Sequence, residues 1–179
     1  MAQLLDKVAL ITGAGQGVGQ GIAFAMAQAG ASVVVTGRTL EKLEKTVAEI
    51  EIRGGRALAL TCDVKSADDL AAAVETTVSS FGSLDILVNN AQEVPLGKLE
   101  DVSDDAFLAG FISGPLASHR LMKLARPHML VRGGGVIFNF VSSAMIRWDM
   151  ATFGAYGAVK AATQVLTRAA AAEWGRDGI

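Results

Sequence analysis

The sequence is poor in the features that assign a chain to several specialised classes of protein. Its single cysteine, Cys62, cannot form an internal disulfide, so a secreted fold held by disulfides is not expected. Its 16 Lys and Arg residues nearly balance 18 Asp and Glu residues, and the net charge of −2 gives no general attraction to nucleic acid or to an anionic membrane. No apolar run approaches the roughly 18 residues of a membrane-spanning helix, and the N-terminus does not have the pattern of a signal peptide. These absences predict a cytoplasmic protein.

Hydrophobic residues, by contrast, make up 51% of the 179 residues, and 20 residues are glycine. This hydrophobic content is too high for a disordered chain. The length fits one compact domain, since domains run to about 100–200 residues. The sequence contains no repeat, low-complexity segment or interdomain linker. We therefore expect a single domain over residues 1–179.

Short apolar runs alternate with helical patterns along this domain. The run at residues 8–11 is typical of a strand buried on both faces, and further strands are predicted at residues 33–35, 57–60, 84–88 and 136–141. Apolar residues at helical spacing predict helices at 18–29, 40–50 and 66–78. Further along the chain, we expect a short helix from Ser103 and a longer one that Pro115 opens and that runs to about residue 132. A last helix is expected to begin at residues 153–156 and to end at about residue 174. This alternation predicts an α/β fold, a doubly wound parallel sheet with helices on both faces. In such open sheets, ligands bind where the strands end.

The loop after the first predicted strand, residues 12–19, reads TGAGQGVG. Glycines here allow a tight turn and bring backbone N–H groups close to a phosphate, and the following helix N-terminus favours an anion. The spacing G-x-x-x-G-x-G differs from the G-x-G-x-x-G dinucleotide fingerprint, and no Lys-Ser or Lys-Thr follows as in a P-loop. The alternatives are a turn needed only for packing, or a loop for another nucleotide-like ligand. The candidate cofactor-binding residues here are Gly13, Gln16, Gly17, Val18 and Gly19.

The second predicted strand ends at Thr36-Gly37-Arg38, where the dinucleotide fingerprint would carry an acid that binds ribose hydroxyls. An arginine suits the 2′-phosphate of NADP(H) instead, because the forked donors of a guanidinium match phosphate oxygens. This favours NADP(H) over NAD(H) as the cofactor. The alternative is that Arg38 is a solvated surface charge.

Polar residues also follow the third and fourth predicted strands. Asp63, beside Val64, could accept a hydrogen bond from an adenine amino group. The alternative is a turn aspartate that bonds its own backbone. Asn89 and Asn90 can fix neighbouring loops and bind the ribose on the nicotinamide side, although they could simply form a turn. Asn89 and Ala91 are the candidate cofactor-binding residues of this segment.

Ser143, Tyr156 and Lys160 form the candidate catalytic set. Ser143 ends the fifth predicted strand, Tyr156 is the only tyrosine of the chain, and Lys160 follows it by four residues. Positions i and i+4 share a helix face, and a nearby ammonium favours the ionised form of a phenol, which makes a tyrosine usable as an acid or base near neutral pH. A serine hydroxyl can hydrogen-bond the same substrate oxygen. These groups suit the exchange between an alcohol and a ketone, with a cofactor carrying the hydride. The alternative is a polar pair on a solvated helix face.

Taken together, the motifs resemble those of a classical short-chain dehydrogenase/reductase. The resemblance rests on residues 12–19, on Cys62-Asp63-Val64, on Asn89-Asn90-Ala91, on Ser143 and on Tyr156-x-x-x-Lys160, which follow the family's order over nearly the whole chain. It implies a Rossmann-like three-layer sandwich, a nicotinamide cofactor and a homotetramer or homodimer. It also implies that Tyr156 is the acid/base, that Ser143 polarises the substrate carbonyl, and that Lys160 binds the nicotinamide ribose and tunes the tyrosine.

The sequence departs from the family in three places. Gln92 stands where the family usually has a glycine after Asn-Asn-Ala. Residues 107–114, where the family carries a catalytic asparagine, contain none, and the expected equivalents are Gly110 or Phe111. Family members continue well beyond residue 179, so the chain is expected to lack the C-terminal strands of the full domain.

These observations predict an NADP(H)-dependent oxidoreductase that interconverts a carbonyl and an alcohol of a small molecule. The departures keep open an alternative from another class, a cofactor-binding protein of the same fold with impaired catalysis. A methyltransferase with a similar glycine loop would leave Ser143, Tyr156 and Lys160 unexplained. No residues stand at metal-ligand spacing, so no metal is expected.

Overall fold

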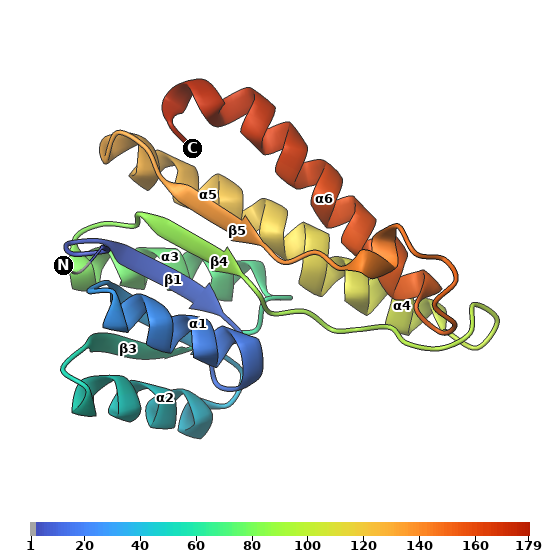
Figure 1. The fold of residues 1–179 in the computed structure, drawn as a ribbon, viewed down its shortest axis with the longest axis horizontal. Coiled ribbons are helices and arrows are strands. Elements are labelled where there is room, and N and C mark those ends of the chain that lie inside the picture. Colours follow the sequence, from blue (N-terminus) through green and yellow to red (C-terminus); the bar gives the residue numbers. More distant parts are fainter. Residues whose placement is uncertain (1–2) are drawn as a thin grey trace.

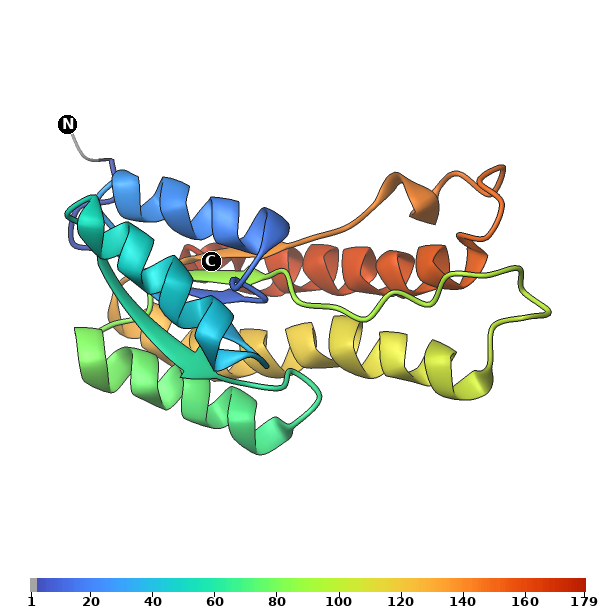
Figure 2. The same ribbon diagram turned by 90° about the horizontal axis from the view of Figure 1, so that it is seen from below.

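The computed structural model describes residues 3–179, which form a five-stranded parallel sheet with helices on both faces (Figures 1 and 2). The strands are β1 (Val8–Thr12), β2 (Ser32–Gly37), β3 (Arg56–Thr61), β4 (Ile86–Asn89) and β5 (Val136–Asn139), in the order β3-β2-β1-β4-β5. The chain winds outward from β1 to β3 and then crosses to β4 on the other side of β1. This reversal between β1 and β4 is the switch point at which open sheets bind ligands. The predicted doubly wound fold is confirmed.

The helices lie in two layers around this sheet. They are α1 (Gly17–Gln28), α2 (Leu40–Ile52), α3 (Ala67–Phe81), α4 (Asp104–Phe111), α5 (Ala117–Val131) and α6 (Gly154–Trp174). Ala9 and Ile11 of β1 pack in the core beneath α1 and α2, whereas Leu10 packs in the core beneath α3 and α5. Strands covered on both faces need apolar residues at every position, which is why they read as continuous apolar runs. Within residues 3–179, no helix is both long and apolar enough to cross a membrane.

Pro115 does not open a helix, so that prediction is wrong. α4 continues through a π-helical turn, η1 (Ile112–Leu116), directly into α5, and Pro115 lies inside this turn. A π-helical turn interrupts the regular ladder of i→i+4 hydrogen bonds, and a proline has no N–H to contribute to that ladder. The expected start of α4 is confirmed, because the Ser103 hydroxyl accepts the Ala106 N–H at 3.2 Å and caps the helix.

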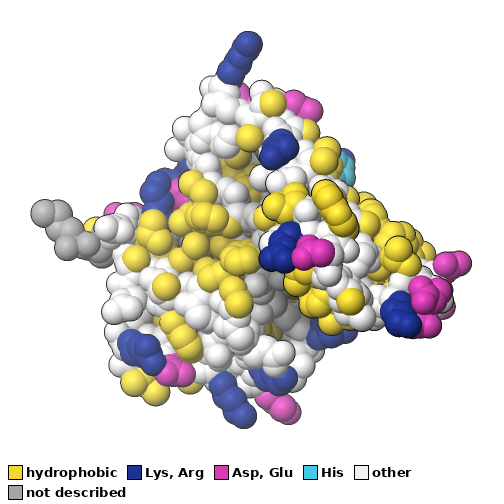
Figure 3. All heavy atoms as spheres, turned by 45° about the vertical axis from the view of Figure 1, so that its right-hand side comes forward, with side chains coloured by type: hydrophobic (Ala, Val, Ile, Leu, Met, Phe, Trp, Pro, Cys, Tyr) yellow, Lys and Arg dark blue, Asp and Glu magenta, His cyan; other side chains and the backbone are white. Residues whose placement is uncertain are grey.

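β5 is shorter than the predicted strand at 136–141 and leaves apolar surface exposed. It ends at Asn139, after which the chain leaves the sheet for a 3-10 turn, η2 (Ser143–Met145). Val136 and Phe138 are 49% and 46% exposed, although Ile86 and Val88, which pair with them on β4, are buried. Hydrophobic side chains form broad patches on the face shown in Figure 3. The described residues therefore leave the β5 end of the sheet only partly covered.

Candidate active site

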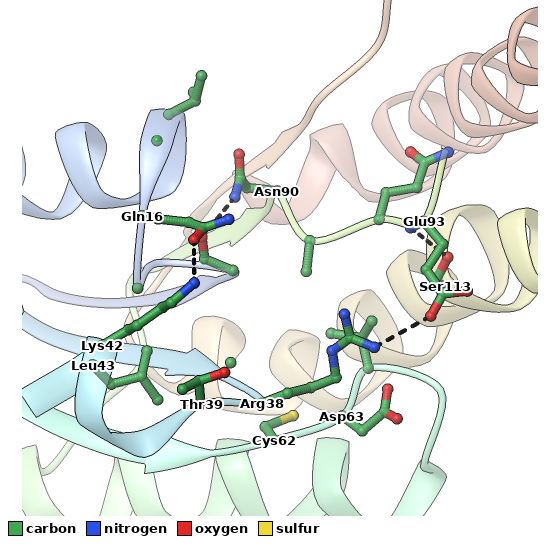
Figure 4. A pocket seen from close by; sticks show the side chains of 18 residues that line it. Gln16, Arg38, Thr39, Lys42, Leu43, Cys62, Asp63, Asn90, Glu93 and Ser113 are labelled. Atoms are coloured by element: carbon green, nitrogen blue, oxygen red, sulfur yellow. Dashed lines mark hydrogen bonds and ion pairs between the residues drawn. The ribbon is translucent and has the colours of Figure 1, made fainter. Parts of the chain in front are cut away.

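A cavity of about 480 Å³ lies at the carboxyl ends of β1 to β4. Its walls are the loops that follow these strands, together with the start of α2 and one residue of η1. The lining residues are Gly13, Gly15, Gln16, Gly17, Val18, Gly37, Arg38, Thr39, Lys42, Leu43, Cys62, Asp63, Val64, Asn90, Ala91, Gln92, Glu93 and Ser113 (Figure 4). The cavity therefore lies at the switch point between β1 and β4.

The glycine loop after β1 brings backbone close to this cavity. Gly13 and Gly17 have φ values of +67° and +59°, which few other residues adopt without strain. A Cβ on Gly19 would lie 2.4 Å from the Gly13 carbonyl oxygen, so only glycine fits there. Glycine at these positions is therefore required by the geometry of the turn.

The N-terminus of α1 is open to an anion from the cavity. Among the described residues, Gln16 makes no side-chain capping hydrogen bond, and the first turn of α1 carries no acidic residue. By contrast, Ser66 caps α3 with its hydroxyl. The Gln16 amide oxygen instead accepts a hydrogen bond from Lys42 Nζ at 2.6 Å. Free N–H groups and the positive end of the helix dipole suit a phosphate, so this loop fits the pyrophosphate of a dinucleotide.

Asn90 and Thr12 lock the loops after β1 and β4 together. The Thr12 hydroxyl oxygen accepts the backbone N–H groups of Asn90 and Ala91, each at 3.0 Å. Asn90 Nδ2 donates to the carbonyl oxygens of Thr12 and Gly13 at 2.9 and 3.2 Å. These bonds fix the part of the cavity wall that contains Ala91.

Asn89 has a different place, within the sheet. It is buried, and its Nδ2 donates to Asn139 Oδ1 on β5 at 2.7 Å. Asn139 Nδ2 in turn donates to the hydroxyl of Thr167 on α6 at 2.9 Å. Asn89 therefore joins β4 through β5 to α6 and does not line the cavity.

Arg38 stands at the rim of the cavity and is paired. Its guanidinium lies 3.5 Å from Glu93 Oε1, and the Lys65 ammonium lies 2.8 Å from the same oxygen. The hydrogen bond to Glu93 raises the pKa of Lys65. Arg38 is 68% exposed by its side chain, yet Figure 4 shows it reaching across the cavity toward Glu93. Arg38 is thus an exposed cation that lines the cavity and is paired with Glu93.

Cys62 and Asp63 directly follow β3 and line the cavity. Asp63 Oδ1 accepts the Lys65 N–H at 3.0 Å, which is the turn geometry of the alternative considered above, and its side chain also lines the cavity. Burial, together with the charges of Asp69 and Asp63, raises the pKa of the Cys62 thiol to about 11. Cys62 is therefore an unreactive buried side chain, since the thiolate is the reactive form.

The candidate catalytic set lies beyond β5, on η2 and α6. A Cβ on Gly157 would lie 2.4 Å from the Ala144 carbonyl oxygen, so a glycine beside Tyr156 lets the turn that carries Ser143 pack directly on α6. Ser143 is exposed and Tyr156 half-buried. The structure thus brings together the elements that carry Ser143 and Tyr156.

Lys160 lies one turn after Tyr156 and is almost fully buried, at 5% exposure. Its ammonium donates a hydrogen bond to the Phe140 carbonyl oxygen and stands 5.7 Å from the centroid of the Tyr156 ring. Burial lowers the pKa of Lys160 to about 8. The lysine therefore places a cation beside the tyrosine at neutral pH.

Gln92 fills space that a glycine leaves open. A Cβ on Gly114 would lie 3.1 Å from Gln92 Cδ and 3.1 Å from a methyl group of Val159. Gly110 instead faces Pro95 at 3.0 Å. Within residues 3–179, Gln92 Nε2 is buried and has no hydrogen-bond partner. Gly114, within the segment 107–114, therefore lies beside Gln92.

The structure brings most of the predicted cofactor residues to one cavity. Its lining includes Gly13, Gln16, Gly17, Val18, Arg38, Asp63, Val64 and Ala91, but Gly19, Asn89, Tyr156 and Lys160 do not contribute to it. Sequence reasoning missed Thr39, Lys42, Glu93 and Ser113. The first two follow the end of β2 and could be found from that position, whereas Glu93 and Ser113 meet only through the fold. In the part of the chain that the structure describes, no three His, Cys, Asp or Glu side chains group as a metal site.

Comparison with known proteins finds a matching family model and similar sequences. The family model of the short chain dehydrogenases matches residues 7–179. An uncharacterized oxidoreductase of Mycobacterium tuberculosis is 39% identical over 172 residues, which cover 96% of this chain and 65% of that protein. The 12alpha-hydroxysteroid dehydrogenase of a Clostridium species is 38% identical over 181 residues, which cover 97% of this chain and 69% of that protein. The chain thus spans about two thirds of the length of these relatives.

Two solved structures are also similar. A 7 alpha-hydroxysteroid dehydrogenase complexed with NADH and 7-oxo glycochenodeoxycholic acid has a TM-score of 0.95 at 35% identity, over 99% of this chain and 69% of that one. A metagenomic short-chain oxidoreductase in complex with NADP has a TM-score of 0.91 at 33% identity, over 98% of this chain and 79% of that one. One neighbour therefore carries NADH and the other NADP.

Proposed function

The chain belongs to the short-chain dehydrogenase family, and we propose that it is an NADP(H)-dependent oxidoreductase that interconverts a carbonyl group and an alcohol. The observation that carries this proposal is the cavity at the switch point, with the glycine loop on one side and the Ser143, Tyr156 and Lys160 elements beyond β5. The residues present fit the cofactor, since the open N-terminus of α1 suits a pyrophosphate.

The choice of NADP(H) is supported by this chain's own residues. No acid stands at the end of β2, where one would hold ribose hydroxyls. Arg38 is there instead and lines the cavity, and a guanidinium binds a phosphate through forked donors. Removing this arginine should therefore weaken NADPH binding much more than NADH binding.

In the proposed reaction, the nicotinamide cofactor supplies or accepts the hydride. In the reducing direction, the carbonyl carbon gains that hydride and the Tyr156 hydroxyl donates its proton to the carbonyl oxygen, so that an alcohol and a tyrosinate result. The Lys160 ammonium stabilises the tyrosinate because it is a cation close to the ring. The Ser143 hydroxyl donates a hydrogen bond to the same substrate oxygen. Oxidation of the alcohol runs through the same steps in reverse.

A second candidate is a cofactor-binding protein with impaired catalysis. Two observations favour it. Gln92 places a large side chain beside Gly114 at a wall of the cavity, and residues 107–114 contain no asparagine. This candidate predicts that the cofactor binds and that no carbonyl compound is reduced.

Fluorescence titration and a turnover assay separate the two candidates. NADPH and NADH are titrated into the wild type and into Arg38→Ala, and NADPH oxidation is then followed against a panel that includes cyclohexanone and oxo-steroids. Our proposal predicts tighter binding of NADPH, a reduced NADPH-to-NADH preference in Arg38→Ala, and turnover of at least one carbonyl. Binding without turnover across the panel would favour the impaired protein, and an unchanged preference in Arg38→Ala would contradict the cofactor assignment.

We also infer that the protein forms a homodimer or homotetramer. The inference is supported by the family resemblance, which implies such an assembly. The half-exposed apolar side chains of β5, Val136 and Phe138, are surface that a second copy of the chain or the C-terminal strands of the full family domain would cover. Light scattering after size exclusion should give a mass of two or four chains, and a monomer would contradict it.

A further inference from the structure

Three charged side chains from three different loops meet beside the cavity, which is lined by two of them, Arg38 and Glu93. Arg38 follows β2, Lys65 follows β3 and Glu93 follows β4. The Glu93 Oε1 atom lies 3.5 Å from the Arg38 guanidinium and 2.8 Å from the Lys65 ammonium. Figure 4 shows the Arg38 and Glu93 side chains joined across the cavity. Two cations therefore converge on a single anionic oxygen.

This convergence shows what kind of group the two cations can hold. They reach one oxygen from separate loops, so the distance between them matches a single small anion. A phosphate monoester carries up to two negative charges and three acceptor oxygens, whereas a carboxylate carries one charge and two oxygens. A phosphate offered at this point would pair with both cations and compete with Glu93 for them.

Glu93 is held in a way that permits this exchange. Its backbone N–H donates to the Ser113 hydroxyl at 2.9 Å, and that hydroxyl donates to the Ala109 carbonyl oxygen at 2.7 Å. The backbone is thus anchored to α4 and η1, while the side chain is 36% exposed. The Lys65 and Glu93 side chains are 35% and 36% exposed and that of Arg38 is 68% exposed, so solvent screens both ion pairs and the carboxylate can turn away from the cations at a modest cost.

We propose that Glu93 competes with the 2′-phosphate of NADP(H) for Arg38 and Lys65, and that Lys65 is the second cation that receives this phosphate. The inference rests on the proposed use of NADP(H) and deepens it. NADH has no 2′-phosphate, so it leaves the pairing of Glu93 with the two cations in place. Glu93 then lowers the preference for NADP(H) below the level that Arg38 and Lys65 alone would give.

The test measures dissociation constants by fluorescence titration of NADPH and NADH, with 2′,5′-ADP and ADP as competing probes. Glu93→Gln should bind NADPH about three- to tenfold more tightly than the wild type, a modest gain because exposed ion pairs are weak, and bind NADH with unchanged affinity. Lys65→Met should weaken the binding of NADPH and of 2′,5′-ADP by several-fold, without changing that of NADH or ADP. Glu100→Gln is the matched control, because Glu100 also pairs with an exposed lysine, Lys98 at 3.9 Å, and lies outside the cavity.

The outcomes distinguish the competition between Glu93 and the 2′-phosphate from the proposed use of NADP(H). Weaker NADH binding in Glu93→Gln would overturn the inference, because Glu93 would then be an acceptor for ribose hydroxyls. Unchanged NADPH binding in both Glu93→Gln and Lys65→Met would also overturn it, while leaving a wild-type preference for NADPH intact. If the wild type prefers NADH and Glu93→Gln shifts the preference toward NADPH, the competition stands and the cofactor assignment fails. Circular dichroism melting of each variant excludes misfolding as the cause.

Discussion

The burial of Lys160 disfavours the charged form of its side chain. It is buried, and burial lowers its pKa to about 8, so the ammonium form is lost as the pH rises through that value. The proposed step needs this cation to stabilise the tyrosinate. We therefore expect kcat/KM for carbonyl reduction to fall as the pH rises through about 8.

The pH profile of Lys160→Met provides the comparison. This variant has no ammonium at any pH, so it should be slower than the wild type and lack the decline near pH 8. Lys123→Met, on the exposed face of α5, should keep the wild-type profile. A wild-type rate that stays constant through pH 8 would contradict the role given to Lys160.

Gly114 and Gln92 are a packed pair whose coupling can be measured. A Cβ on Gly114 would press against Gln92 Cδ and Val159, each at 3.1 Å, so Gly114→Ala should destabilise the fold by about 1–2 kcal/mol. Gln92→Gly should remove part of this cost in the double variant, since the Gln92 side chain is one of the two contacts and Val159 remains. Urea unfolding of the wild type, both single variants and the double variant gives the coupling energy.

Gly21→Ala is the matched control for this cycle. Gly21 lies within α1, and a Cβ there would meet nothing within 4 Å. The substitution should stabilise the protein by about 0.5–1 kcal/mol, because alanine restricts the unfolded chain and favours the helix. Equal effects at Gly114 and Gly21, or additive effects of Gly114→Ala and Gln92→Gly, would contradict the packing described here.

A buried carboxylate, Asp85, lies at the end of the sheet opposite the cavity, where β1 and β4 begin. Asp85 is 3% exposed and accepts hydrogen bonds from the Val8 N–H at the start of β1, from the Ser83 hydroxyl and from the Arg132 guanidinium, at 2.9–3.0 Å. Burial alone would raise the pKa of this carboxyl, but the hydrogen bonds outweigh burial and hold its pKa below the usual value. The network ties β1 and β4 to the turn before β5.

This lowered pKa gives a stability effect of definite sign. The carboxylate stabilises the fold at any pH above the pKa of the unfolded chain, about 3.9, and that contribution is lost as the pH falls through the lower pKa of the folded state. The free energy of unfolding of the wild type should therefore decline at acid pH. Asp85→Asn should be less stable by about 2–3 kcal/mol at neutral pH, since it weakens charged hydrogen bonds, and should show a smaller acid decline. Equal acid declines in both proteins would assign the effect to other groups.

The strands and helices differ in how well the sequence predicts them. Residues 33–35 are predictable as a strand because burial on both faces requires uninterrupted apolar residues. Pro115 misleads because a proline at the first position of a helix and a proline inside a π-helical turn have the same local sequence signature. The continuity of α4 and α5 depends on packing that the local pattern does not encode.

The residues of the cavity also divide into those that the local sequence predicts and those that only the fold brings together. The glycine loop and Arg38 are predictable because each directly follows a strand, and parallel strands end at one edge of the sheet. The pairing of Arg38 with Glu93 joins residues 55 positions apart, and it depends on the order of strands in the sheet. The contact of Gln92 with Gly114 likewise requires the fold, since no local pattern relates a loop after β4 to a turn within a helix.

The molecule as a whole combines a candidate cofactor cavity at the carboxyl ends of β1 to β4 with a candidate catalytic set beyond β5. The proposed reaction requires both parts to act together, with Tyr156 as the group that exchanges the proton. The most direct measurement is NADPH oxidation by Tyr156→Phe, with a carbonyl that the wild type reduces, beside a titration of NADPH binding to the same variant. We predict that NADPH still binds and that turnover falls by about 10²–10⁴-fold, the range for loss of a general acid. Turnover by Tyr156→Phe at the wild-type rate would contradict the account.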